Sequence, residues 1–86
     1  MKVRIPSPLL SYTNSKEVQA QGATLAEVFA DLDRQFPGLR FRVINEQDEI
    51  REHIKIFVNQ SIATRLSDTV GANDEIHIIT AISGGA

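Results

Sequence analysis

The side chains that could take part in chemistry are few and widely separated in this sequence. His53 and His77 lie 24 residues apart without H-x-H spacing or clustered carboxylates, a pattern that does not predict a metal site. The acidic pairs Asp48-Glu49 and Asp74-Glu75 are typical of solvated charge. The absence of cysteine excludes a thiolate nucleophile, and neither a Gly-rich phosphate loop nor a dinucleotide fingerprint occurs. We therefore expect a protein without a catalytic site of its own and without a bound cofactor.

The C-terminal segment is the one stretch that could itself undergo a reaction. Ser83, Gly84, Gly85 and Ala86 follow an apolar, largely β-branched run. Glycine has no Cβ, so this tail is thin and its backbone is unrestricted. A frayed terminus is a common alternative, although two adjacent glycines at a given place arise by chance in only about one chain in 200. If the chain has a reaction, we expect the tail to be its substrate.

Composition narrows the class of protein. Eighty-six residues are enough for one domain, which we place at residues 1–82 with a flexible tail at 83–86. The net charge of −2 argues against nucleic acid or an anionic membrane as the main partner. No apolar run approaches the roughly 20 residues that span a bilayer, and no signal-peptide pattern occurs. We expect a cytoplasmic protein.

One amphipathic helix is expected to carry the core. Thr24 and Glu27 have the spacing of a capping box, in which the Thr24 hydroxyl accepts from the Glu27 N–H and the Glu27 carboxylate accepts from the Thr24 N–H. Pro37-Gly38 ends the helix. Its apolar stripe is typical of core rather than of a cofactor site and comprises Leu25, Val28, Phe29, Leu32 and Phe36.

The remaining pattern predicts strands. They are expected at 2–5, 17–20, 53–59, 61–64 and 75–82, with a connecting loop around Leu9, Leu10 and Tyr12 and an extended or helical piece at 39–43. One helix must then cover one mixed sheet, which is a two-layer α+β arrangement.

The sheet should have one open face. Period-two alternation turns Ile54, Ile56, Val58, Ile76 and Ile78 toward the helix and sends Phe57, His77 and Ile79 outward. Exposed apolar groups that cluster commonly mark interaction sites, whereas isolated ones need no explanation. We predict that Phe57, His77 and Ile79 form a partner surface.

Several segments together resemble the ubiquitin-like sulfur carriers of the MoaD/ThiS type. The resemblance extends over almost the whole chain, and no single motif is specific. The matching pieces are Thr24-Leu25, Phe57-Val58-Asn59-Gln60, Asp74-Glu75-Ile76 and Ser83-Gly84-Gly85. The branch that supplies sulfur for cysteine synthesis is most similar, through Ile5-Pro6, Ala20 to Leu25, Pro37-Gly38 and Phe57-Val58-Asn59.

The resemblance implies a fold and a reaction. The fold is a β-grasp, with four to five strands and the first and last side by side. Such carriers have their terminal glycine, here Gly85, adenylated by an E1-like enzyme with ATP and magnesium. A sulfur donor then displaces AMP and leaves a thiocarboxylate, which donates sulfur to an acceptor such as a cysteine synthase or the large subunit of molybdopterin synthase, or in thiamine synthesis.

Ala86 departs from the family pattern, because active carriers end on the second glycine. A zinc-dependent JAMM-type peptidase could remove it, it could be a remnant of cloning, or the protein could be no carrier. A second reading is a ubiquitin-like modifier conjugated to lysines through Gly85. A third is a β-grasp binding module with an inert tail. The sequence does not separate these alternatives, and it names neither the acceptor pathway nor the oligomeric state.

Overall fold

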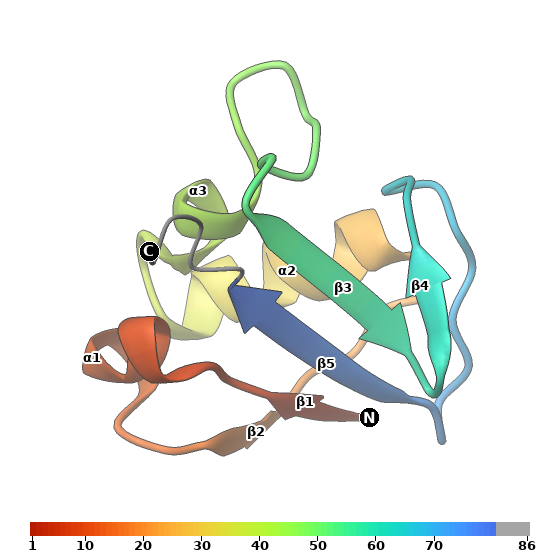
Figure 1. Ribbon diagram of the computed structural model, residues 1–86. Helices are drawn as coiled ribbons and strands as arrows, with labels where there is room; N and C mark the ends of the chain where they lie inside the picture. The colour runs from red at the N-terminus through yellow and green to blue at the C-terminus, as the bar shows by residue number, and fades with distance from the viewer. Residues whose placement is uncertain (81–86) are drawn as a thin grey trace.

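Five strands form one mixed sheet in the order β2-β1-β5-β3-β4, and helix α2 crosses behind it (Figure 1). The computed structural model describes residues 1–80. The strands are β1 (Lys2–Arg4), β2 (Glu17–Gln19), β3 (Ile54–Val58), β4 (Ser61–Ala63) and β5 (Glu75–Thr80). The helices are η1 (Ser7–Leu9), α1 (Leu10–Thr13), α2 (Leu25–Gln35) and α3 (Leu39–Val43).

The pairing of the strands confirms the predicted β-grasp. β1 runs parallel to β5, whereas the β1–β2, β3–β4 and β3–β5 pairs are antiparallel. The first and last strands are therefore neighbours, and β5 lies at the centre of the sheet between β1 and β3. β1, β2 and β4 are each one residue shorter than predicted, and β3 is one residue shorter at each end. β5 begins at Glu75 as predicted, and the last two residues of its predicted range, 81 and 82, lie outside the described residues.

The core lies between the sheet and α2. Four residues of the predicted helical stripe have no exposed surface, namely Leu25, Val28, Phe29 and Leu32, while Phe36 is half-buried against them. Ile56 and Ile76 contribute fully buried side chains from the facing side of the sheet. Burial of apolar surface, worth roughly 25 cal/mol per Å², is what holds α2 to the sheet.

The start of α2 differs in one contact from the predicted capping box. The Thr24 hydroxyl accepts from the Glu27 N–H at 3.3 Å, as expected. The Glu27 carboxylate, however, accepts from the N–H of Ala23 at 2.9 Å rather than from that of Thr24. Thr24 also forms a bridge with Thr69, in which the Leu25 N–H donates to the Asp68 carbonyl and the Val70 N–H donates to the Ala23 carbonyl.

The segment between β1 and β2 was expected to be a loop and is helical. Pro8 occupies the first turn of η1, where its missing N–H removes no hydrogen bond, and α1 follows directly and ends at Asn14 in the left-handed region. Leu9 is buried and Tyr12 is half-buried against the core, so these turns do cover it as predicted. Residues 39–43, which were expected to be either extended or helical, form helix α3.

Candidate functional site

Strand β5 leads to the C-terminal tail and is the most constrained strand of the sheet. Its Ile76 and Ile78 are 0% and 3% exposed, and it is paired with β1 at residues 75–77 and with β3 at residues 76–80. Thr80, the last described residue, is paired with Ile54 of β3. The predicted site residues Ser83, Gly84, Gly85 and Ala86 lie outside the described residues.

The entry to β5 is fixed by a network around Asp74. Its carboxylate accepts from the Gly71 N–H at 2.7 Å and from Asn59 Nδ2 at 3.1 Å. These hydrogen bonds, that from Gly71 first, lower the pKa of Asp74. Asn59 has a positive φ of 58° in the turn between β3 and β4, and its Oδ1 accepts from the Glu75 N–H. This network joins the β3–β4 hairpin to the start of β5.

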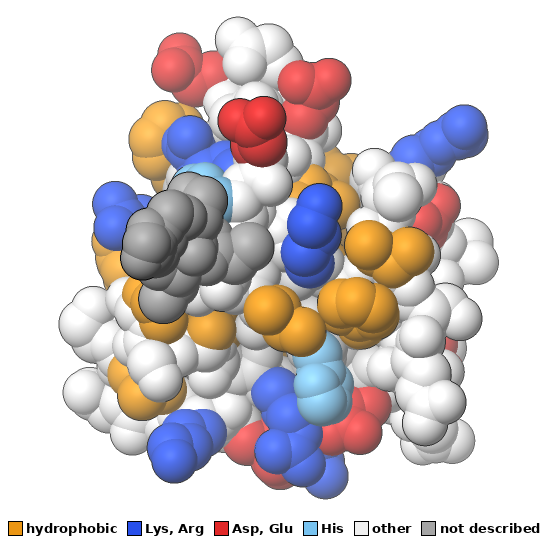
Figure 2. All heavy atoms as spheres, in the orientation of Figure 1, with side chains coloured by type: hydrophobic (Ala, Val, Ile, Leu, Met, Phe, Trp, Pro, Cys, Tyr) orange, Lys and Arg blue, Asp and Glu red, His pale blue; other side chains and the backbone are white. Residues whose placement is uncertain are grey.

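The open face of the sheet carries a central apolar cluster (Figure 2). Phe57 lies opposite both Ile62 and His77 on neighbouring strands, and Ile79 follows two residues after His77 along β5. Ile79 is 43% exposed, as the alternation predicted, but Phe57 is only half-buried rather than fully exposed. Its cross-strand neighbours account for this partial burial.

Ile62 belongs to the same cluster, although the sequence pattern did not predict it there. It is 53% exposed on the edge strand β4. The alternation of β4 gave no reason to link it to Phe57, because the pairing depends on the register set by the Asn59-Gln60 turn. We call Phe57, Ile62, His77 and Ile79 the sheet patch.

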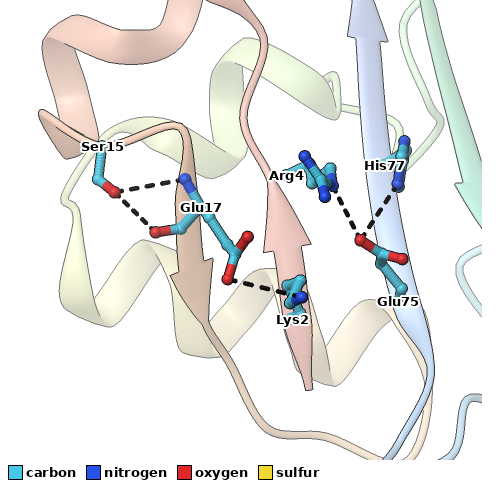
Figure 3. Close-up of polar contacts among 6 residues, drawn as sticks. All are labelled: Lys2, Arg4, Ser15, Glu17, Glu75 and His77. Atoms are coloured by element: carbon cyan, nitrogen blue, oxygen red, sulfur yellow. Dashed lines mark hydrogen bonds and ion pairs between the residues drawn. The ribbon is translucent and has the colours of Figure 1, made fainter.

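A row of ionised side chains borders the sheet patch on β1, β2 and β5 (Figure 3). Glu75 Oε2 accepts from Arg4 Nε at 2.8 Å and lies 3.4 Å from His77 Nε2, while Lys2 Nζ lies 3.8 Å from Glu17. The hydrogen bond from Arg4 lowers the pKa of Glu75, and the same bond raises the pKa of Arg4. Glu75 was interpreted as solvated charge. The parallel β1–β5 pairing that brings Arg4 beside it is not visible in a local pattern.

Within residues 1–80, no three histidine or acidic side chains lie close enough to hold a metal ion. His53 is exposed just before β3, whereas His77 lies on the open face. No helix in this part of the chain is both long and apolar enough to cross a membrane. The features that stand out are the sheet patch and the central strand that leads to the tail.

Comparison with known proteins gives whole-chain matches. The model of the ThiS family matches residues 3–85. Sulfur carrier protein CysO of Mycobacterium tuberculosis (strain ATCC 25618 / H37Rv) is 29% identical over 89 residues, which cover 96% of both chains. A chain of the Amycolatopsis orientalis BexX/CysO complex superposes with a TM-score of 0.90 at 30% identity and covers 98% of each chain. SAMP1 of Haloferax volcanii gives 0.77 at 26% identity over 98% of this chain and 97% of that one.

Proposed function

We propose that this chain, which belongs to the ThiS family, is a sulfur carrier protein that serves other enzymes as a substrate. The observation that carries the proposal is its end-to-end similarity to CysO, whose name states that function. The sequence adds a Gly84-Gly85 pair just after the central strand. In this role the protein needs no catalytic site, because the reacting group is its own C-terminal carboxylate.

The proposed chemistry takes place on Gly85. An oxygen of its carboxylate bonds to the α-phosphorus of ATP, and magnesium pyrophosphate leaves. A sulfur donor then attacks the acyl carbon, and AMP leaves with that oxygen. With hydrosulfide as the donor, loss of its proton leaves a thiocarboxylate on Gly85. With a persulfide as the donor, the product is an acyl disulfide, which a thiol reduces to the thiocarboxylate while it is itself oxidised to a disulfide with the donor's remaining sulfur. The thiocarboxylate sulfur attacks an acceptor carbon and displaces its leaving group, which forms a thioester. Water then hydrolyses that thioester, so the acceptor keeps the sulfur as a thiol and Gly85 regains its carboxylate.

The tail has to reach an active site in another protein. From Thr80 to Gly85, six residues at about 3.3 Å each extend at most about 20 Å. Small residues such as Ser83 and Gly84 suit a narrow channel. Ala86 must first be removed, for which a JAMM-type peptidase has the right activity, because a carboxylate on Ala86 lies one residue too far and carries a Cβ.

The sheet patch is the proposed docking surface for successive partners. Its apolar side chains lie on β5, on the neighbouring strand β3 and on the edge strand β4, so a protein bound there is close to the end of β5. The first partner is the E1-like adenylating enzyme. The second is the sulfur acceptor, for which the similarity to CysO favours a cysteine synthase over the large subunit of molybdopterin synthase or a thiamine pathway enzyme. These reactions belong to the cytoplasm and involve neither nucleic acid nor membrane.

Intact-mass analysis of the protein from its native cells tests the proposal. The expected species has lost one alanine residue and carries one sulfur in place of one oxygen. Incubation with ATP and the E1-like enzyme should form the adenylate only after Ala86 is removed. Retention of Ala86 on a chain that is nevertheless adenylated would contradict the processing step. Removal of residues 83–86 without loss of function would instead favour a binding module with an inert tail.

A second candidate function is supported by the similarity to SAMP1, a small archaeal modifier protein. In that case the activated Gly85 carbonyl is transferred to lysine amines of other proteins rather than to sulfur. The identity to SAMP1 is lower than that to CysO, which ranks this function second. Lysines that carry a branched peptide of residues 66–85 in tryptic digests of the native proteome would establish it, because Arg65 is the last trypsin site before the tail. The absence of such branches alongside a thiocarboxylate would exclude it.

A further inference from the structure

Phe41 is an exposed aromatic side chain on the helical layer, away from the sheet patch. Only three large apolar side chains are exposed in residues 1–80, and the other two, Ile62 and Ile79, lie on the sheet. Phe41 is 51% exposed, although its helix α3 buries Leu39 and Val43 completely. Leu39 and Val43 therefore anchor α3 in the core, while Phe41 faces solvent.

Arg51 holds Phe41 through two contacts. Its guanidinium carbon lies 4.6 Å from the centroid of the Phe41 ring, which is within the range of a cation–π interaction. Its Nε donates to the Phe41 carbonyl at 2.8 Å. The aromatic ring and the guanidinium are therefore already positioned before any partner binds, and this reduces the entropy cost of binding.

The arginines beside Phe41 differ in their pairing. Arg40 donates to Asp48 at 3.0 Å. Arg42 is exposed, and among the side chains of residues 1–80 no carboxylate forms an ion pair with Arg42 or Arg51. Arg51 stacks on the exposed ring and Arg42 follows Phe41 in α3, so two cationic groups in this region can each pair with a carboxylate from outside. We call Phe41, Arg42 and Arg51 the α3 patch.

The α3 patch is tied to the point where the tail begins. The Arg51 N–H donates to the Val43 carbonyl, and the Arg51 carbonyl accepts from the Ile54 N–H, both at 2.9 Å. Ile54 is in turn paired with Thr80 at the end of β5. In Figure 1, α3 lies at the end of the sheet toward which β5 runs. A protein that holds the tail is therefore close to the α3 patch as well as to the sheet patch.

We propose that the α3 patch is a second docking surface, which binds a carboxylate-bearing segment of the activating enzyme while the tail is in that enzyme's active site. This inference rests on the proposed function. The partner's carboxylates pair with Arg42 and Arg51, and an aliphatic or aromatic side chain packs on the Phe41 ring. Arginine and aromatic residues are enriched among the residues that dominate binding energy.

The charges nearby favour a protein over a nucleic acid as the occupant. The adjacent loop carries Glu46, Asp48 and Glu49, all exposed, and the whole chain has a net charge of −2. A polyanion would meet this loop as well as the arginines and be repelled by it. A protein segment can place one or two carboxylates locally beside Arg42 and Arg51.

The test measures adenylation of the chain ending at Gly85 by the E1-like enzyme of the same organism, as a function of carrier concentration. The variants are Phe41→Ser, Arg51→Gln and the pair together. Arg65→Gln is the matched control, because Arg65 is exposed after the edge strand β4. Circular dichroism establishes that each variant is folded. We expect the double variant to lose about tenfold in kcat/KM, through KM, with Arg65→Gln unchanged.

Salt dependence provides a second readout. Added salt should lower the wild-type kcat/KM, because screening weakens exposed ion pairs, and this dependence should flatten in Arg51→Gln. Folded variants with the wild-type KM and the wild-type salt dependence would overturn the α3 patch proposal while adenylation itself proceeds. Salt-sensitive binding of a single-stranded oligonucleotide at the patch would also overturn it. A wild-type chain that the enzyme does not adenylate would instead refute the proposed function, and this proposal with it.

Discussion

Replacement of Phe29 by alanine should remove a large fraction of the stability of the domain. Phe29 lies in the middle of α2 and has no exposed surface. A buried Phe→Ala change costs about 3–5 kcal/mol, from lost transfer free energy and the cavity left behind. The total stability of a small domain is about 5–15 kcal/mol. One substitution therefore removes a large fraction of the free energy of unfolding.

The structure supplies a matched control in the same residue type. Phe41→Ala makes the same chemical change at a side chain that is 51% exposed, and it removes mainly the Arg51 stacking, worth about 0.5–1 kcal/mol at an exposed site. In a domain of this size, 1 kcal/mol shifts Tm by about 4–8 °C. We thus expect Phe29→Ala to lower Tm by at least about 12 °C and Phe41→Ala by less than about 8 °C.

Thermal unfolding followed by circular dichroism, with urea titration for the free energy, measures both variants. If Phe29→Ala melts within a few degrees of the wild type, α2 does not pack on the sheet as described, and the account of the core fails. Equal losses for Phe29→Ala and Phe41→Ala would also refute it, because burial is what separates the two positions.

Three further predictions concern the helix cap, the ionised row and the sheet patch. Thr24→Ala removes the hydroxyl that caps α2 and should cost about 1 kcal/mol, seen as a lower urea midpoint with an unchanged slope. The pKa of Glu75 is lowered in the folded protein, so its contribution to stability is present above the ordinary carboxyl pKa of 4.5 and is lost as the pH falls below that value. Glu75→Gln should therefore lose less stability than the wild type on acidification through that range. An identical dependence of stability on pH would contradict the role of Arg4. Phe57→Ala and Ile79→Ala should each weaken activation by the E1-like enzyme at least tenfold, about 1.4 kcal/mol, while remaining folded, and unchanged adenylation rates would show that the sheet patch is not the docking surface.

The fold could be predicted from the sequence because its signals are local and agree with one another. The α2 stripe, the Thr24 cap and the short alternating strands each depend on neighbouring residues. The central place of β5 does not follow from these patterns alone. It came from the order of the elements and from the resemblance to the MoaD/ThiS type, and the pairing of β1 with β5 confirms it.

The parts that the sequence did not predict depend on contacts between segments, which the alternation within a single segment does not show. Ile62 joins the sheet patch only because the β3–β4 turn places it opposite Phe57. Glu75 looked like solvated charge because its partner Arg4 is 71 residues away. The α3 patch was missed for the same reason, since Arg51 reaches Phe41 across the loop that separates α3 from β3.

The central position of β5 also has a consequence for synthesis on the ribosome. The chain makes β1 early and β5 after every other described element, yet β1 and β3 are joined only through β5. Before β5 emerges, the β1–β2 and β3–β4 hairpins each expose an unpaired inner edge, which is a site for aggregation. Contacts between such distant segments also slow folding. A nascent chain that ends before β5 therefore cannot complete the sheet. The domain can fold fully only after β5, the strand that leads to the C-terminal tail, has been synthesised.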